Sequence, residues 1–583
     1  MEYDINHMKW WGWGNPKKEF NDLDKPGLWK YIEKKLNHKK TEKRTPINFE
    51  AINLPPSKIP DIFIHRLEKN FDSEQIKLDK TERLVHTYGK SFRDLWRIRQ
   101  GLIDQAPDLV VYPKNEEQVQ SIIKLAIEFN FCLIPFGGGT NIVGSIEVKD
   151  KLDRPSISVD MKLMNKLLTL NQKSKMATIQ AGCTGPYLEY QLNQKGFTLG
   201  HFPDSFEYST LGGWVATRSA GMQSDHFGKI EDMVLALKMI TPQGVIETRT
   251  VPKSSNGIDI NHLCIGSEGI LGIITEVTLV VHPLPAKKEY FGFLFPSFQQ
   301  GMNAIYECVE SNCLPEVTRL NDADKTALSL ACKEKSTGFG KKLVSKAIAY
   351  YLRNVKQFNL NEVCLMITCI SGTNKIFKKH KQAVDKIFKK HGGFYLGASP
   401  GKAFAKSKYD FPYLRDYVMD YHIMSDVSET SVTWDQLIPF YLNTKEKITK
   451  AILETGVLPW VGCHISHNYN SGASLYFTFA CKNQPGQELE QYLHIKKAAE
   501  DAFIQNGGTL SHHHAVGYEH LPWMKEEISA TGILAIKALK QGLDPLSIMN
   551  PGKLIPSTEP FNEWGHTECF ETKSALSLAL PQD

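Results

Sequence analysis

Two patterns of hydrophobic and polar positions alternate along the chain. Short, mainly apolar runs at 131–134, 277–281 and 363–370 predict buried strands. Longer polar segments with apolar residues at helical spacing lie between such runs. One of them begins at Asn115, a typical N-cap residue, directly after the strand-like run 108–113. This mixture of strands and helices favours an α+β fold.

Changes in these patterns divide the chain of 583 residues, which is long enough for two or three cores, into four parts. The first part is rich in Trp and Lys and carries a helical pattern from Thr81 to Arg99, so it predicts a helical N-terminal extension. The break between the second and third parts falls at Pro283-Leu284-Pro285. The expected parts are residues 1–103, 104–285, 286–506 and 507–583.

Composition narrows the classes of partner. The net charge is +5 and no Lys/Arg stripe with aromatics appears beyond the N-terminal region, so nucleic acid is not expected as a partner. Eleven cysteines without a C-x-x-C pair or an N-terminal signal peptide predict free thiols in a reducing compartment. The apolar stretch 270–281 falls short of the roughly 20 residues of a membrane helix. The basic cluster at 34–44 could touch an anionic membrane surface or form a solvated helix face.

Residues 135–141 read Pro-Phe-Gly-Gly-Gly-Thr-Asn and directly follow an apolar run. Adjacent glycines let backbone N–H groups converge on one anion, which suggests a pyrophosphate, although glycine clusters also serve ordinary turns. Ile142 and Ser145 stand where the common dinucleotide and P-loop motifs need Gly and Lys. Further small-residue loops at 203–205, 209–221 and 266–275 suggest several strand ends around one extended ligand.

As a set, these loops resemble the flavoproteins of the vanillyl-alcohol oxidase type, over roughly residues 105–285. The resemblance implies a two-subdomain FAD-binding domain, a separate α+β substrate (cap) domain and a closing segment that returns to the cofactor. Residues 130–145 contain no histidine for covalent attachment, so we expect non-covalent FAD.

Four groups of positions match the family's contacts with FAD. In chain order, the first two groups match contacts with the pyrophosphate and ribose, the third matches the flavin region, and the fourth matches the adenine side. They are Pro135, Phe136, Gly137, Gly138, Gly139, Thr140 and Asn141; Asp204, Ser205, Phe206, Glu207, Tyr208, Ser209 and Thr210; Thr217, Arg218, Ser219 and Ala220; and Glu268, Gly269, Ile270, Leu271, Gly272, Ile273 and Ile274.

His512, His513 and His514 form the densest titratable cluster of the chain. In an extended segment at most two of them could meet one ligand, where they could serve as acid, base or oxyanion partner. A zinc site that includes His464 and His467, or a chance surface run, stays open as an alternative. Tyr476 lies in an apolar run, where a tyrosine is commonly a core aromatic.

Within the family, the flavin-dependent 2-hydroxyacid dehydrogenases carry Gly-Glu-His-Gly-Ile/Val-Gly where this chain has the three histidines, and a metal-binding histidine where it has Tyr476. With these departures the chain is similar to the family members that form the ether bond of ether lipids. That similarity implies exchange of the fatty acid of 1-acyl-dihydroxyacetone phosphate for a long-chain fatty alcohol, through a covalent adduct at flavin N5 and without net redox change.

The same similarity implies roles for individual side chains, with no metal. Tyr476 would move the C1 proton, and the histidines would stabilise the ketone oxygen and assist the leaving and entering groups. Arg415 would pair with the phosphate, although an ion pair with Asp416 or Asp410 is the plainer interpretation. Arg319 is expected behind the residues that contact the substrate, where it would orient the cofactor or a helix, with Asp322 and Asp324 as local partners.

Further expectations rest on the resemblance alone: the peroxisomal lumen, peripheral membrane contact and a homodimer. The chain ends at Leu580-Pro581-Gln582-Asp583, which is not a Ser-Lys-Leu address. The segment 314–406 is the expected source of an apolar tunnel for the alcohol. Two alternatives stay open, a flavin dehydrogenase of a 2-hydroxy acid or aromatic alcohol, and a non-catalytic flavin-bound scaffold.

Overall fold

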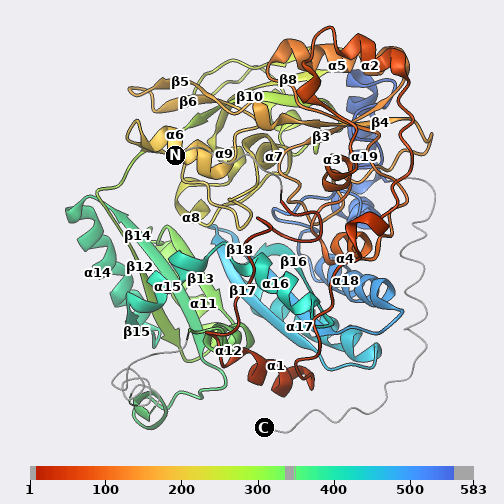
Figure 1. The fold of residues 1–583 in the computed structure, drawn as a ribbon. Coiled ribbons are helices and arrows are strands. Elements are labelled where there is room, and N and C mark those ends of the chain that lie inside the picture. Colours follow the sequence, from red (N-terminus) through yellow and green to blue (C-terminus); the bar gives the residue numbers. More distant parts are fainter. Residues whose placement is uncertain (1–7, 335–346, 348–349, 557–583) are drawn as a thin grey trace.

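The computed structural model describes residues 8–334, 347 and 350–556. The chain end at 580–583, the last part of the expected closing segment and a portion of the expected tunnel segment lie outside the described residues. The described chain contains sheets of four, five, two and seven strands together with many helices, which confirms the predicted α+β class. In Figure 1 the two larger sheets of residues 104–285 occupy the upper half, and the seven-stranded sheet occupies the lower half. We call these halves the two-sheet part and the cap.

The four-stranded sheet of the two-sheet part carries the glycine-rich run. Its order is β1 (Ile76–Lys77), β2 (Leu109–Val111), β4 (Ser156–Asp160) and β3 (Cys132–Phe136), with the last three strands parallel. The crossover helix α5 (Glu116–Phe129) begins as predicted, because the Asn115 side chain accepts from the backbone N–H of Gln118. Its apolar face packs against β2, β3 and β4, so the glycine run leaves a fully supported strand.

The five-stranded sheet is antiparallel, in the order β5 (Leu167–Asn171), β6 (Met176–Gln180), β10 (Ile273–Val280), β8 (Val234–Thr241) and β9 (Gly244–Glu247). A small pair joins β7 (Phe197–Thr198) to β11 (His282–Pro283). Short helices connect these strands: α6 (Gly185–Asn193), α7 (Leu211–Ala216), α8 (Ser224–Phe227), α9 (Ile230–Met233) and α10 (Ile260–Cys264). The small-residue loops around α7 and before β10 face the end of β3.

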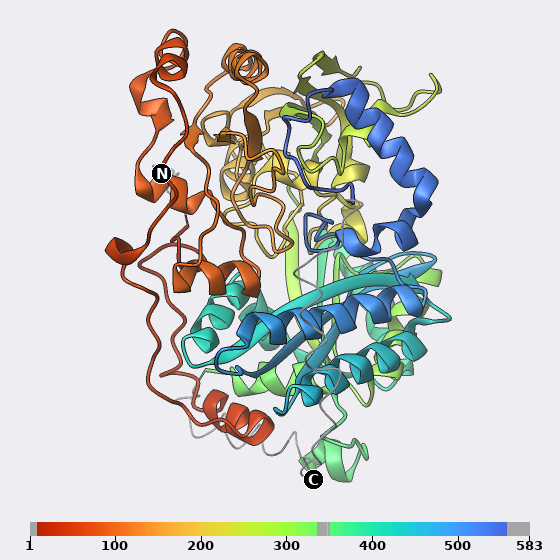
Figure 2. The ribbon, with the colours of Figure 1, turned by 90° about the vertical axis from the view of Figure 1, so that its right-hand side faces the viewer.

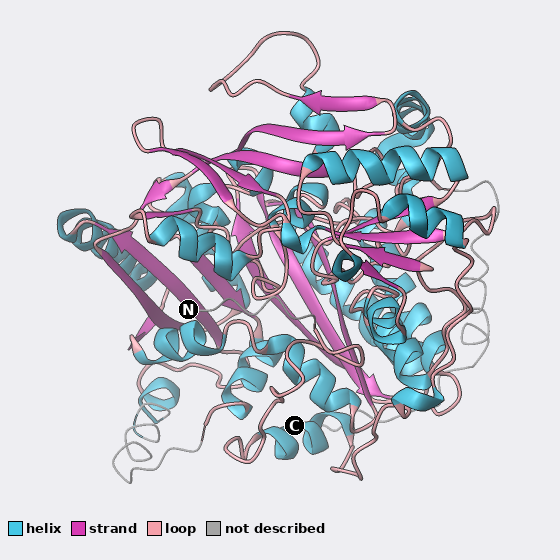
Figure 3. Ribbon diagram, turned by 45° about the horizontal axis from the view of Figure 1, so that its top comes forward, coloured by secondary structure: helices cyan, strands magenta, loops and turns pink. Residues whose placement is uncertain are grey.

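The cap is one antiparallel sheet in the order β15 (Phe394–Gly397), β12 (Lys287–Phe295), β14 (Cys364–Gly372), β13 (Val317–Asn321), β17 (Trp460–Asn468), β18 (Gly472–Lys482) and β16 (Ile423–Thr433). Its helices are α11 (Phe298–Glu310), α12 (Ala323–Ala331), α14 (Asn374–Lys390), α15 (Ser399–Ser407), α16 (Phe411–Met419), α17 (Leu437–Glu454) and α18 (Glu488–Gln505). Figure 3 shows the long strands running through the middle of the molecule, with most helices outside them.

Strand alternation decides which side chains of the cap reach the two-sheet part. On β18, Leu475, Phe477 and Phe479 belong to the main hydrophobic core together with Phe440 and Phe503 of α17 and α18. Successive side chains of a strand point to opposite faces. Tyr476, between two of these core residues, therefore points away from the core, toward the two-sheet part.

The N-terminal extension runs along one side of both halves (Figure 2). It contains α1 (Leu28–Leu36), α2 (Asp61–Leu67), α3 (Lys80–Val85) and α4 (Phe92–Gln100). The helical pattern from Thr81 to Arg99 corresponds to two helices, because the chain turns between Val85 and Ser91, and Ser91 caps the second helix. A Cβ on Gly89 would overlap with the backbone oxygen of Asn141, so this turn packs directly against the glycine run.

The basic cluster at 34–44 is largely engaged within the protein. Lys35 lies 3.1 Å from Asp324, and Lys40 lies 2.7 Å from Asp22. Lys43 lies 3.4 Å from Asp420 of the cap. The pairs with Asp324 and Asp420 attach α1 and the following segment to the cap, which argues against a free membrane-binding patch at this place.

The closing segment returns to the two-sheet part. Helix α19 (Met524–Leu543) is followed by a chain that pairs with β3, where Leu133 donates to Ile548 O at 2.8 Å and accepts from Asn550 N at 2.8 Å. Within the described ranges, no helix is long and apolar enough to cross a membrane.

Candidate active site

A cavity between the two-sheet part and the cap collects most of the expected cofactor positions. The residues that line it are all seven from Pro135 to Asn141, and Asp204, Ser205, Ser209, Thr210, Thr217, Ser219, Ala220, Glu268, Gly269, Gly272, Ile273 and Ile274. From the expected tunnel segment, Val317, Thr318, Arg319 and Phe404 line it as well. Loops that lie 140 residues apart in sequence therefore meet at one ligand-sized space.

The loops of this cavity fit the diphosphate of a dinucleotide. A Cβ on Gly137 would overlap with the side chain of Thr210, and one on Gly138 would overlap with the backbone oxygen of Tyr208. Only glycine allows the two loops to approach this closely. Ser267 Oγ and Asn550 Oδ1, which belong to lining residues, are buried without a hydrogen-bond partner among the described residues. Such atoms are expected to bind a ligand.

Several of the expected cofactor residues do not line the cavity: Phe206, Glu207, Tyr208, Arg218, Ile270 and Leu271. Phe206 stacks on Trp214 in the core, while Arg218, at φ 51°, turns outward to His262 O. These residues support the loops from behind. Glu268 lines the cavity, but its carboxylate accepts from Val516 N and Gly517 N at 2.8 Å each and so holds the closing segment in place.

The cap contributes a row of three side chains across neighbouring strands. Strand register places His464 of β17 opposite Tyr476 of β18, and Tyr476 opposite Glu429 of β16. The rings of His464 and Tyr476 lie 4.8 Å apart. Since directly opposite residues share a face, all three point toward the two-sheet part. We call them the cross-strand row.

A bulge in β17 adds one more histidine to this wall. The pairing of β17 with β18 shifts between Ser466 and Asn468, and His467 adopts φ 57°. A bulge re-aims the side chain of the extra residue. His467 lines the cavity and its Nδ1 lies 2.7 Å from Ser224 Oγ.

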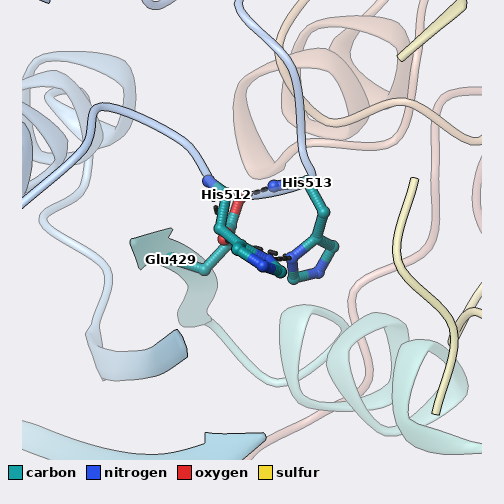
Figure 4. Close-up of side chains that lie close together, drawn as sticks. All are labelled: Glu429, His512 and His513. Atoms are coloured by element: carbon teal, nitrogen blue, oxygen red, sulfur yellow. Dashed lines mark hydrogen bonds and ion pairs between the residues drawn. The ribbon is translucent and has the colours of Figure 1, made fainter. Parts of the chain in front are cut away.

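Glu429 holds the histidine triplet, and Figure 4 shows its carboxylate beside His512 and His513. Its carboxylate accepts from the backbone N–H groups of His512 at 3.1 Å, His513 at 2.9 Å and His514 at 2.8 Å. The Ser511 hydroxyl donates a further hydrogen bond at 2.8 Å. The segment is thus a turn wrapped around a carboxylate, whereas an extended segment was considered from the sequence.

The turn gives the three rings different surroundings. His513 and His514 line the cavity, whereas the ring of His512 is engaged by Tyr469 OH at 2.6 Å and by His513 Nδ1 at 2.9 Å. The ring of His514 lies 5.3 Å from that of Tyr476. Two of the three histidines, together with the tyrosine, therefore face the space that the glycine run also faces.

Burial sets the protonation of this wall. It lowers the pKa of His464, His467, His512 and His514 well below the ordinary value, so these imidazoles are neutral at pH 7. Burial, reinforced by Asp204, raises the pKa of Tyr476 well above its ordinary value. For Glu429 two effects oppose each other. Burial alone would raise the pKa of its carboxyl group, but His513, His514 and the hydrogen bonds have the larger effect and hold that pKa well below its usual range.

The positions of His464 and His467 do not support the alternative of a zinc site that includes them. His464 Nδ1 lies 2.6 Å from Lys325 Nζ, and His467 is engaged by Ser224, so neither joins the triplet as a ligand. Among the described residues, Glu429, His512 and His513 do place ligand atoms within 4.8 Å of one another. The Glu429 oxygens, however, already accept several backbone N–H groups, and this fits a hydrogen-bonded structural carboxylate better than a metal ligand.

Arg415 lines the cavity and pairs with Asp416, at 3.0 Å from Nη2. The pair is not a surface pair, because the two side chains are 10% and 8% exposed. The guanidinium also donates to Lys90 O, and Asp410 instead binds Lys18 at 2.8 Å. The arginine is thus held rigidly at the edge of the cavity.

Arg319 also lines the cavity, 3.9 Å from Asp204. The expectation that Asp322 and Asp324 are its partners is wrong. Both acids bind Lys445, at 2.9 and 2.7 Å, because Asp322 caps α12 and lies beyond the end of β13.

The sequence analysis missed three residues at this site: Glu429, Lys325 and Trp13. Glu429 is one of two acids, with Asp426, in the otherwise uncharged strand β16, a signal that could have been noticed. Lys325 lies 2.6 Å from His464 Nδ1 and 2.8 Å from Thr478 Oγ1, and burial, together with Arg319, lowers its pKa to about 7. Trp13 lines the cavity from the N-terminal extension, and no sequence signal connected it to this place.

Comparison with known proteins agrees with this architecture. Residues 107–249 match the family model described as FAD binding domain, and residues 284–554 match that described as FAD linked oxidases, C-terminal domain. A solved structure of p-cresol methylhydroxylase, at 13% identity and a TM-score of 0.64 over 87% of this chain and all of that chain, shows the same fold.

Much closer similarity links the chain to one enzyme. It is 40% identical to alkyldihydroxyacetonephosphate synthase of Dictyostelium discoideum, over 96% of each chain, and 35% identical to that of Caenorhabditis elegans, over 95% of this chain and 96% of the relative. A solved structure of alkyldihydroxyacetonephosphate synthase matches with a TM-score of 0.84 at 37% identity, covering 95% of this chain and all of that chain. The chain therefore belongs to the alkyldihydroxyacetonephosphate synthase family of FAD-binding enzymes.

Proposed function

We propose that this protein exchanges the fatty acid of 1-acyl-dihydroxyacetone phosphate for a long-chain fatty alcohol and so forms the ether bond of an ether lipid. The observation that carries the proposal is the shared cavity. His464 and Tyr476 of the cross-strand row, with His513 and His514 of the histidine turn, face the same space as the glycine run. Family membership supports the substrates, since its members are named for the alkylated product.

The glycine run and the loops at 203–210, 217–220 and 267–274 would hold FAD by non-covalent contacts. Bound there, the flavin supplies a nucleophilic nitrogen, N5, for C1 of the substrate, and the exchange needs no net oxidation or reduction. Acid precipitation is expected to leave the yellow colour in the supernatant. Colour that stays with the precipitate would contradict non-covalent binding.

The cap side chains would perform the proton transfers and bind the charged groups. Tyr476 keeps its phenol proton at neutral pH and lies beside neutral imidazoles, so it can exchange a proton with C1 of the substrate. His513 and His514 can hydrogen-bond the ketone oxygen and the carboxylate that leaves. Arg415 can pair with the phosphate, for which a planar guanidinium is well suited.

The other expectations are part of the same proposal: the domain division at 103, 285 and 506, residence in the peroxisomal lumen, a homodimer and peripheral contact with membranes. Helix α14 supports the last of these, because Lys375, Lys378, Lys379, Lys386 and Lys389 are all exposed on it. Clustered lysines attract anionic lipid surfaces.

The decisive experiment incubates the FAD-loaded protein with palmitoyl dihydroxyacetone phosphate and labelled hexadecanol, without an electron acceptor. Labelled alkyl product and released palmitate are expected. Bleaching of the flavin by lactate, with no alkyl product, would overturn the proposal in favour of a dehydrogenase. Neither product nor bleaching would favour a non-catalytic scaffold.

A further inference from the structure

Among the described residues of the N-terminal extension, one reaches the cavity. Trp13 is a lining residue, and the next lining residue along the chain is Pro135. Its side chain is buried, with the residue only 3% exposed. The ring packs edge-on against Tyr208, with centroids 5.9 Å apart, and lies in a small cluster with Met8 and Tyr413. An element outside both halves of the molecule therefore forms part of the wall between them.

The turn that carries Trp13 is docked tightly on helix α16. Lys9 N donates to Gly14 O at 2.9 Å, which closes the turn, and Trp13 N donates to the Asp416 carboxylate. A Cβ on Gly12 would overlap with Asp416, and one on Gly14, at φ 77°, would overlap with Tyr413. Both glycines are therefore required for this contact.

The docking point connects Trp13 to the expected phosphate-binding residues. Asp416 binds the backbone of Trp13 and the guanidinium of Arg415. On the other side, Tyr208, against which the indole packs, presents its backbone oxygen to Gly138 of the glycine run. Trp13 thus lies where the diphosphate cradle and the cavity arginine adjoin.

The indole N–H of Trp13 has no acceptor among the residues that the structure describes. Its Nε1 atom is buried and without a hydrogen bond. Five other indoles of the described chain do have an acceptor, since Trp29, Trp214, Trp434, Trp460 and Trp523 each donate to a protein oxygen. A buried donor left unpaired is costly, and an unpaired donor in the wall of a ligand cavity indicates an acceptor on the ligand.

We propose that Trp13 is a ligand-binding residue whose indole N–H donates a hydrogen bond to a phosphoryl oxygen in this cavity. Two phosphoryl groups have the required chemistry, the diphosphate of FAD and the phosphate of the substrate. If the acceptor is the substrate phosphate, the inference rests on the proposed function; if it is the diphosphate of FAD, it does not. The N-terminal extension then completes the binding site and is more than a covering of the core.

Trp13→Phe tests the proposal, because it keeps an aromatic ring and removes the donor. The dissociation constant of FAD is measured by quenching of flavin fluorescence on titration of apoprotein. That of dihydroxyacetone phosphate is measured from the difference spectrum of the flavin-loaded protein. An increase of about tenfold in the first constant identifies the diphosphate as acceptor, and the same increase in the second identifies the substrate phosphate. Both constants within twofold of wild type would overturn the proposal.

Trp29→Phe is the matched control, since its indole donates to Tyr417 OH and does not line the cavity. Neither dissociation constant is expected to change in it. Trp13→His, which retains an N–H donor, should recover part of the lost affinity, whereas a purely structural role of the ring would not show such rescue.

If Trp13→Phe does not fold, Gly12→Ala provides the second test. It leaves the indole intact and forces the turn away from Asp416, so one of the two dissociation constants, for FAD or for dihydroxyacetone phosphate, should rise. Unchanged constants in folded Gly12→Ala would contradict the proposal. All these measurements are of binding, so they stand even if the wild-type protein fails to catalyse the exchange.

Discussion

The two walls of the cavity are built in different ways. The wall from the two-sheet part is made of backbone, in loops whose glycines let them pack edge to edge. The wall from the cap is made of side chains, brought together by strand register and by a turn wrapped around Glu429. Backbone can bind a cofactor without titrating, whereas proton transfer needs side chains with controlled pKa values. Substitutions on the two walls should therefore have separable effects.

The largest effect is expected on the cap wall. Tyr476→Phe removes the phenol proton and keeps the ring, so the exchange rate should fall by about a thousandfold while the dissociation constant of FAD stays the same. Rates come from labelled hexadecanol incorporation and affinities from flavin fluorescence. Tyr395→Phe, at an exposed position, is the control. A rate within tenfold of wild type would remove Tyr476 from the proposed chemistry.

On the backbone wall, a substitution is expected to weaken the binding of FAD. Gly138→Ala places a Cβ against the backbone oxygen of Tyr208, which cannot move aside as a side chain would. The affinity for FAD should fall by about 100-fold, by analogy with overpacking of a core. Gly542→Ala, where a Cβ would meet nothing within 4 Å, is the matched control. Normal FAD binding in Gly138→Ala would show that the cradle is elsewhere.

Glu429→Gln should give a smaller, mixed effect. The amide of the introduced glutamine has one acceptor oxygen where the carboxylate has two. Some backbone donors of the histidine turn therefore lose their acceptor, which should lower the free energy of unfolding by about 2 kcal/mol. The exchange rate should fall with it because the histidine rings lose their fixed position. Urea unfolding and rate measurements on the same preparation check both effects.

The pH dependence of this variant has a definite sign. The pKa of Glu429 is held below its usual value in the folded protein, so its carboxylate contributes stability that is present above about pH 4 and lost as the pH falls through the lowered pKa. The stability difference between wild type and Glu429→Gln should therefore shrink in acid. A difference that is constant from pH 7 to pH 3 would contradict this account.

The last effect concerns stability alone and is expected at Lys325, behind the cross-strand row. Burial lowers its pKa to about 7, whereas in the unfolded chain a lysine holds its proton to about pH 10. The unfolded state therefore binds more protons between these values, and stability should rise with pH over that range by at most about 1.4 kcal/mol per unit. Lys325→Met should abolish this rise, whereas exposed Lys450→Met should keep it, as urea unfolding at pH 7, 8 and 9 would show. A rise that persists in Lys325→Met would contradict the assignment.

The sequence by itself determined the elements and the backbone wall. The apolar runs at 131–134, 277–281 and 363–370 became β3, β10 and β14. All seven residues of the glycine run face the cavity. Such features depend on local properties, namely periodicity, capping and the absence of a Cβ, and these can be read from neighbouring residues.

Only the tertiary structure decided the cap wall and the partners of its charges. Glu429 lies more than 80 residues before the histidines that it holds, and Trp13 lies about 400 residues before Asp416, to which its turn is bound. Arg319 binds toward Asp204 and not the acids next to it in sequence. Strand register and burial select these pairs, and neither can be derived from a residue's immediate neighbours, because both depend on segments distant in the chain.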